Sequence, residues 1–110
     1  MIKLPIKPLS ANGAWKGRRF RSDAYKAFQD HVSLLLPNSI DIPEGQLEIH
    51  LEFGFSSAGS DWDNPIKPFQ DCLAAKFGFN DNRIKRGIVD VYPVKKGAEY
   101  IKFQIKALNR

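Results

Sequence analysis

The sequence predicts a single α+β domain, in which two helices pack on one mixed sheet of about four strands. Three observations support this fold class. Residues 45–55 alternate apolar and polar side chains, and two other segments repeat apolar side chains at spacings of three and four. The chain has 110 residues, which is the length of one domain. The predicted elements follow the order strand, helix, strand, helix, strand, strand.

The first third of the chain predicts a strand, a loop and a helix. Residues 2–6 alternate before prolines interrupt them, which indicates a short strand at a sheet edge. Residues 9–21 are rich in Ser, Asn, Gly and Arg and predict an ordered but irregular loop. Ser22 can cap a helix that ends at Pro37, and its apolar stripe is formed by Tyr25, Phe28, Val32 and Leu35.

The middle of the chain predicts a strand followed by a helix. Residues 45–55 indicate a half-buried strand and give the clearest period-two signal of the sequence. A second helix is predicted from about residue 65 to residue 76. Pro68 lacks an amide hydrogen, so we expect this helix to begin only near Lys67. Residues 61–64 would then enter the helix as an extended or looped segment.

The last third predicts two strands. Residues 78–82 carry glycine, asparagine and aspartate, which is turn chemistry after a helix. Residues 84–94 and 99–107 are rich in β-branched and aromatic side chains. Residues 95–98 include Gly97 and predict a turn that joins the two strands as a hairpin.

Composition and charge narrow the class of protein. The formal net charge is +5, and no apolar run approaches the roughly 20 residues of a membrane span. The N-terminus lacks the apolar core of a signal peptide. Cys72 is the only cysteine, so we expect a buried structural thiol and a reducing compartment. These features predict a cytoplasmic protein with no membrane partner. We also expect no small-molecule organic cofactor.

Basic residues are concentrated near the N-terminus. A run of this kind is by itself more often a solvated surface loop than a binding site. Cationic loops also bind phosphate backbones, because they release the counterions of the nucleic acid. The acidic cluster described next strengthens the interpretation of this run as a DNA-binding loop. We expect DNA contacts in this region from Asn12, Lys16, Arg18, Arg19 and Arg21.

Acidic residues cluster in the middle of this basic chain. Asp61 and Asp63 are two apart, so on an extended segment their carboxylates face the same side. Asp81, from the loop after the second helix, could add a third carboxylate. Hard divalent cations such as Mg²⁺ prefer oxygen ligands of this kind. The sequence therefore predicts a protein that attracts a polyanion, holds metal against it and cuts it.

Polar neighbours extend this predicted site. Lys67 lies about one helical turn beyond Asp63, where its ammonium could neutralise charge that develops on a phosphate. Asp71 lies four residues after Lys67 and could pair with it and orient it. Asn64 and Asn80 flank the acids and are assigned supporting roles.

The acidic segment is also compatible with a purely structural role. Asp63 or Asn64 could belong to a solvated turn and cap the second helix. The segment lacks the glycine and glutamate that a calcium loop requires, and the two histidines and the cysteine have no zinc-like spacing. Trp62 alternates away from the acids, which predicts packing beneath the site, with base stacking as the alternative.

The ordered set of residues resembles the RusA-type Holliday junction resolvases, a family of endodeoxyribonucleases common in phages and prophages. The resemblance covers most of residues 1–110 as a single domain. It includes the proline, serine and asparagine of the N-terminal segment 4–12 and residues 22–32 of the first helix. Its most specific part is the motif Asp61-x-Asp63-Asn64-x-x-Lys67, followed by Asp71 and Asp81.

This resemblance implies a homodimeric enzyme that binds branched, four-way DNA and nicks two strands symmetrically. It implies Mg²⁺ as cofactor, with Mn²⁺ as a substitute. The metal-binding acids of the family would fall on Asp61, Asp63 and Asp81, and its essential lysine on Lys67. The chain departs from the family at Asn80, where a second acid is common, so this position brings no charge.

Two further functions remain open on the sequence alone. The first is a non-catalytic, structure-selective DNA-binding protein, which is supported by the uncharged side chain of Asn80. The second is a metal nuclease that acts on other DNA structures. The combination of the acids with Lys67 favours catalysis over binding alone.

Overall fold

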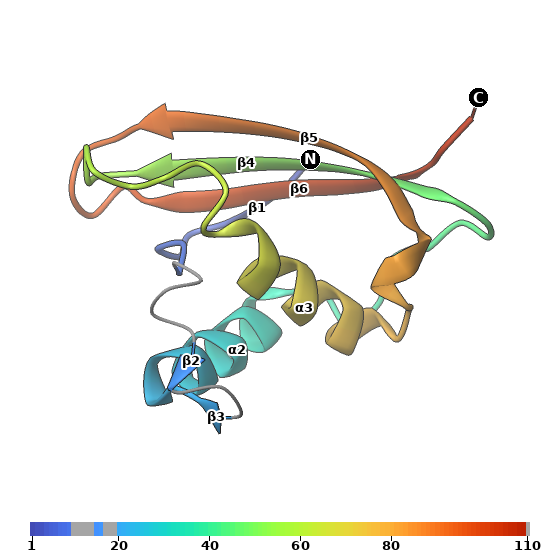
Figure 1. The fold of residues 1–110 in the computed structure, drawn as a ribbon, viewed down its shortest axis with the longest axis horizontal. Helices are drawn as coiled ribbons and strands as arrows, with labels where there is room; N and C mark the ends of the chain where they lie inside the picture. Colours follow the sequence, from blue (N-terminus) through green and yellow to red (C-terminus); the bar gives the residue numbers. More distant parts are fainter. Residues whose placement is uncertain (10–14, 17–19, 110) are drawn as a thin grey trace.

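The structure is a computed structural model that describes residues 1–9, 15–16 and 20–109, with only the backbone described at positions 15, 16, 20 and 21. It confirms an α+β fold, with two helices packed on one mixed four-stranded sheet (Figure 1). The elements in chain order are β1 (Ile2–Leu4), β2 (Trp15–Lys16), β3 (Phe20–Arg21), α2 (Asp23–Leu35), β4 (Leu47–Phe55), α3 (Ile66–Phe77), the 3-10 helix η1 (Asp81–Arg83), β5 (Ile84–Pro93) and β6 (Tyr100–Ala107).

The order of strands in the main sheet is β1-β6-β4-β5. β4 pairs in parallel with β5 and antiparallel with β6, and β1 pairs antiparallel with β6. Parallel neighbours need a long crossover connection, and α3 supplies it between β4 and β5. The sheet is therefore mixed, as the sequence predicts.

The predicted hairpin between the last two strands is wrong, because β4 lies between β5 and β6. The turn at residues 95–98 reverses the chain but does not decide which strand becomes the neighbour. β4 is the strand with the most buried apolar side chains, so a central position with a partner on each side removes the most apolar surface from water. A second correction concerns the predicted irregular loop at residues 9–21, where β2 and β3 pair as short antiparallel strands.

Both helices cover the same face of the sheet (Figure 1). Ser22 caps α2 as predicted, since its hydroxyl oxygen accepts a hydrogen bond of 3.1 Å from the backbone amide of Tyr25. α3 begins at Ile66, slightly earlier than expected. Pro68 is tolerated because it stands in the first turn, where the amides have no partner within the helix.

The core fills the space between the helices and the sheet. β4 contributes every second side chain, and α2 and α3 contribute their apolar stripes. The predicted thiol is confirmed as buried, with Cys72 3% exposed. The core contains six buried phenylalanines, which are Phe28, Phe53, Phe55, Phe69, Phe79 and Phe103. Within the described residues, no helix combines the length and the apolar character that crossing a membrane requires.

The other face of the sheet has no helix over it in the described part of the chain (Figure 1). It carries charged and polar side chains that bind one another along β4 and across the strands. Glu48 accepts from His50 over 2.7 Å and from Arg86 over 3.2 Å. The hydroxyl of Tyr100 donates to Glu52 over 2.6 Å.

Gly54 leaves room for the ring of Tyr100 on this face. A Cβ atom at position 54 would come within 2.5 Å of two ring carbons of Tyr100. We expect Gly54→Ala to lower the free energy of unfolding by about 1–3 kcal/mol, because the ring would have to shift. Urea denaturation measures this, and Gly59→Ala is the matched control, since nothing lies within 4 Å of a Cβ at that glycine. Equal stability of the two variants would contradict the prediction.

Candidate functional site

The acidic segment forms a turn between β4 and α3. The backbone amide of Ile66 donates a hydrogen bond of 3.2 Å to the carbonyl oxygen of Asp63, and the amide side chain of Asn64 donates to Asp61 over 3.3 Å. The looped form of the predicted entry is therefore realised and the extended form is not, so a period of two does not place the two carboxylates on one side. The N-cap position of α3 is Pro65, without a side-chain cap, so the capping alternative is not realised either.

The carboxylates of this turn are exposed to solvent. Asp63 has no hydrogen-bond or ion-pair partner for its side chain in the described part of the chain. Trp62 is 61% exposed, which contradicts the expected packing beneath the site. Because the segment turns, Trp62 is directed to solvent along with its acidic neighbours.

Lys67 lies at the centre of the candidate site. Its Nζ atom is 2.7 Å from Oδ1 of Asp71 and 3.3 Å from Oδ2 of Asp81. The pairing of Lys67 with Asp71, four residues later on α3, is confirmed. η1 follows α3 directly and carries Asp81 back to the same face of the helix. The structure thus brings together three of the predicted side chains, from two elements.

Gln70 is a member of this cluster that the sequence did not indicate. Its side-chain amide donates a hydrogen bond of 3.1 Å to Oδ2 of Asp81, the same oxygen that Lys67 approaches. Gln70 lies three residues after Lys67, which places both on one face of α3. This spacing is the only sequence signal for Gln70, and it is informative only because Asp81 faces the same side of α3.

These contacts stabilise the charged forms of Lys67 and Asp81. The hydrogen bond from Gln70 and then the contact with Lys67 lower the pKa of Asp81 below its ordinary value. The hydrogen bond to Asp71 and, less strongly, the contact with Asp81 raise the pKa of Lys67. These shifts favour the ammonium form of Lys67 and the carboxylate form of Asp81 at neutral pH. From α2, the hydroxyl of Tyr25 makes a long hydrogen bond of 3.5 Å to Asp71.

The predicted metal ligands are not gathered in one group. Among residues 1–9 and 22–109, no three Asp, Glu, His or Cys side chains lie together in a way that could hold a metal ion. Asp61 and Asp63 lie in the turn before α3, whereas Asp81 is bound to Lys67 and Gln70. The donor set consists of oxygen atoms, which suits Mg²⁺ or Mn²⁺ chemically. A metal centre at these residues stays a prediction.

Asn80 has a structural contact of its own. It is the N-cap of η1, and its Oδ1 atom accepts a hydrogen bond of 3.0 Å from the backbone amide of Asn82. The carbonyl oxygen that could have supported a metal is thus engaged in holding the turn that positions Asp81.

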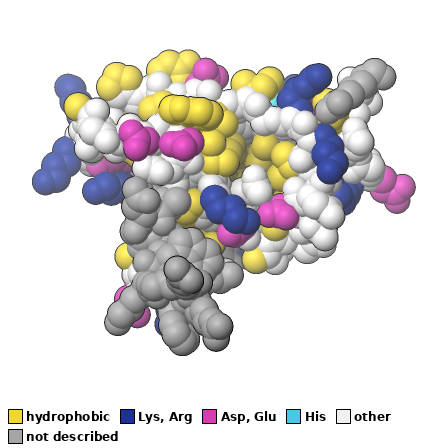
Figure 2. All heavy atoms as spheres, in the orientation of Figure 1, with side chains coloured by type: hydrophobic (Ala, Val, Ile, Leu, Met, Phe, Trp, Pro, Cys, Tyr) yellow, Lys and Arg dark blue, Asp and Glu magenta, His cyan; other side chains and the backbone are white. Residues whose placement is uncertain are grey.

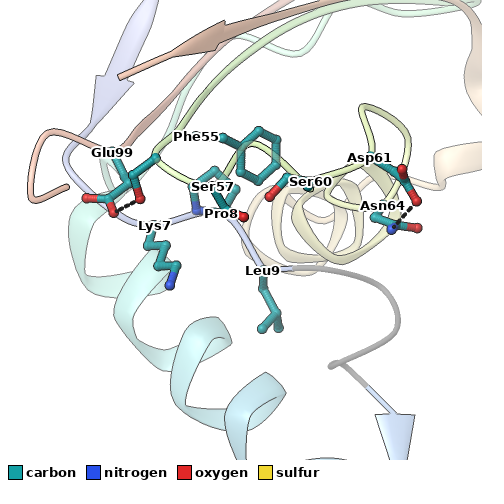
Figure 3. Close-up of a pocket in the computed structure, with 11 residues that line it drawn as sticks. Lys7, Pro8, Leu9, Phe55, Ser57, Ser60, Asp61, Asn64 and Glu99 are labelled. Atoms are coloured by element: carbon teal, nitrogen blue, oxygen red, sulfur yellow. Dashed lines mark hydrogen bonds between the residues drawn. The ribbon is translucent and has the colours of Figure 1, made fainter. Parts of the chain in front are cut away.

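A pocket of about 480 Å³ lies beside the acidic turn (Figure 3). Lys7 and Leu9 reach it from the segment after β1, and Phe55 forms an apolar wall at the end of β4. Ser60 and Asp61 line its other side. The pocket therefore joins the N-terminal segment to the turn that carries the predicted ligands.

The expected DNA contacts of Asn12, Lys16, Arg18, Arg19 and Arg21 lie outside the residues whose side chains the structure describes. In the view of Figure 2, the described Lys and Arg side chains stand in several separate places and not in one continuous patch.

α3 and η1 thus present an exposed cluster of Lys67, Gln70, Asp71 and Asp81, with an acidic turn before it. The members of the cluster lie close enough to influence one another's charge, and Asp63 stands without a partner in the described residues. No protein-family model matches the sequence, and no curated protein matches it.

Proposed function

We propose that the protein is a metal-dependent endodeoxyribonuclease that binds four-way DNA junctions and resolves them by paired, symmetric nicks. The observation that carries this proposal is the position of the Lys67 ammonium, 2.7 Å from Asp71 and 3.3 Å from Asp81. A lysine held between carboxylates on an exposed surface, beside a turn with two further acids, suits phosphodiester chemistry better than it suits a stabilising role. Surface ion pairs alone contribute little to stability.

Each residue of the cluster has a proposed role. Asp61, Asp63 and Asp81 do not form one group in the described residues, so they would have to come together to hold Mg²⁺, with Mn²⁺ as a substitute. The bound ion would activate water and neutralise charge on the scissile phosphate. Lys67 would neutralise charge on a phosphate oxygen, since its side chain is 57% exposed and can reach solvent. Asp71 would keep Lys67 oriented, with help from Tyr25.

Charge and symmetry support the proposed substrate. The net charge of +5 favours a polyanion, and the basic run at residues 16–21 would contact phosphates. A four-way junction offers equivalent strands, and a two-fold symmetric homodimer would offer two equivalent sites to cut them.

A second candidate function is favoured by specific observations. Asn80 brings no charge, and its carbonyl oxygen is engaged within η1. Lys67 already approaches the Asp81 oxygen that a metal would share. These contacts would suit a structure-selective DNA-binding protein without catalysis.

A comparison of substrates separates these functions. Synthetic four-way junctions, flaps, duplexes and single strands are incubated with Mg²⁺, with Mn²⁺ and with EDTA. We expect paired nicks in the junction with either metal, and complete loss of cleavage in EDTA while a gel shift of the junction persists. Binding without cleavage under all conditions would support the non-catalytic alternative. Equal cutting of flaps or duplexes would instead indicate a metal nuclease that acts on other DNA structures.

A further inference from the structure

β5 is an outer strand of the sheet with a partner on one side only. It spans ten residues and pairs in parallel with β4, and in the described chain no strand lies beyond it (Figure 1). The backbone amide and carbonyl groups along such an edge are a template for another strand. The other edge differs, because β1 is only three residues long.

Side chains on the open face of β5 suggest which strand could pair there. Arg86, Ile88, Asp90 and Tyr92 alternate on this face, and Ile88 and Tyr92 are 43% and 48% exposed. Asp90 lies directly opposite Glu52 of β4, and like charges in this position repel. Within the described residues, no cation pairs with Asp90. The face therefore carries an uncompensated acid two residues from an exposed isoleucine.

We propose that β5 pairs antiparallel with β5 of a second copy of this chain, about a two-fold axis at Ile88. Such an axis is perpendicular to the sheet, so the open faces of both copies lie on the same side of the joined sheet. The residue numbers of two directly opposite positions then differ by an even number. With the axis at Ile88, Arg86 lies opposite the partner's Asp90, and Asp90 lies opposite the partner's Arg86. The two Ile88 side chains meet at the centre.

Neighbouring registers lack this complementarity. An axis at Gly87 would place Arg86 opposite the partner's Ile88, and an axis at Val89 would place Arg86 opposite the partner's Tyr92. Only the register centred on Ile88 therefore sets both arginines against both aspartates. Arg86 already donates to Glu48 over 3.2 Å, but a guanidinium has five N–H donors and can serve a second carboxylate.

The pairing would join the four strands of each copy into one continuous sheet. η1 runs directly into β5, so the two Asp81 side chains would be fixed at opposite ends of the joined strands. The paired nicks of the proposed function need such an arrangement, but the pairing itself does not depend on nuclease activity.

Sedimentation velocity over a range of protein concentrations tests the pairing. We expect the wild-type chain to form a dimer, and Arg86→Asp or Asp90→Arg alone to raise the dimer dissociation constant by at least about tenfold, because each creates two like-charge contacts. The double variant with both substitutions exchanges the charges and should return the constant to near the wild-type value. Slower hydrogen exchange of the β5 amides at high than at low protein concentration is expected as well.

Lys106→Asp is the matched control. Lys106 lies opposite Glu48 on the β6 side, so this variant also places an aspartate beside Glu48 but leaves β5 unchanged. It should keep the dimer. A monomeric wild type, or single variants that associate normally, would overturn the pairing, and so would a double variant that is no better than the singles. A monomer that still nicks junctions would overturn the pairing alone, whereas a dimer that cuts nothing would overturn only the proposed function.

Discussion

Lys67→Met is expected to lower the rate of junction cleavage by at least about a hundredfold while junction binding changes little. Methionine keeps most of the length of the side chain and removes the ammonium that lies 2.7 Å from Asp71 and 3.3 Å from Asp81. The loss should affect the chemical step, because the proposed role of Lys67 is to neutralise charge that develops on the phosphate. Single-turnover cleavage with Mg²⁺, together with a gel shift, measures the two effects separately.

Lys76→Met is the control for this variant. Lys76 lies on the same helix, but its ammonium donates to the carbonyl oxygen of Ser33 over 3.1 Å and not to the acidic cluster. We expect it to cleave at the wild-type rate. Similar losses in both variants would remove Lys67 from the proposed chemistry.

The same variant has a readout that does not require cleavage. The contact with Lys67 is one of the causes that lower the pKa of Asp81, after the hydrogen bond from Gln70. Lys67→Met should therefore raise the pKa of Asp81 towards its ordinary value, and Lys76→Met should leave it unchanged. A carboxylate with a lowered pKa stabilises the fold above its unfolded-state pKa and loses this contribution as the pH falls through the folded-state value. NMR titration of Asp81 measures the change.

Phe69→Ala is expected to lower the free energy of unfolding by about 3–5 kcal/mol. Phe69 is 0% exposed, and its ring lies 6.4 Å from that of Phe53 and 5.7 Å from that of Phe103, between centroids. The variant removes a ring that joins α3 to both central strands, and the surrounding side chains can fill the cavity only in part. Because native domains have a total stability of about 5–15 kcal/mol, this loss would be a large fraction of it.

Trp62→Ala controls for the loss of a large aromatic side chain close to the same helix. Its ring is 61% exposed, so we expect a change within about 0.5 kcal/mol. Urea denaturation of both variants measures the difference. A small effect at Phe69 or a large effect at Trp62 would contradict the assignment of the core.

The sequence predicted well those features that depend on local periodicity. The stripe of α2, its cap at Ser22 and the alternation along β4 each report a buried face that the chain itself encodes. The contact between Lys67 and Asp71 was predictable for the same reason, because a helix fixes the positions of residues four apart.

Features that depend on distant parts of the chain were not predictable in this way. The turn at residues 95–98 indicates a reversal, yet the insertion of β4 between β5 and β6 depends on how much apolar surface β4 buries. The predicted packing of Trp62 depends on an extended segment, and the chain instead turns before α3. Gln70 joined the candidate site only because η1 brings Asp81 to its side of α3.

The burial of Cys72 gives the protein a built-in chemical reporter. As the single thiol of the chain, 3% exposed among core side chains, it should react with a disulfide reagent much faster in molecules that have opened than in closed ones. The rate of labelling in native buffer therefore follows the opening of the interior, without denaturant and without added tags. The same reagent would report whether a variant that loses cleavage has retained a closed interior.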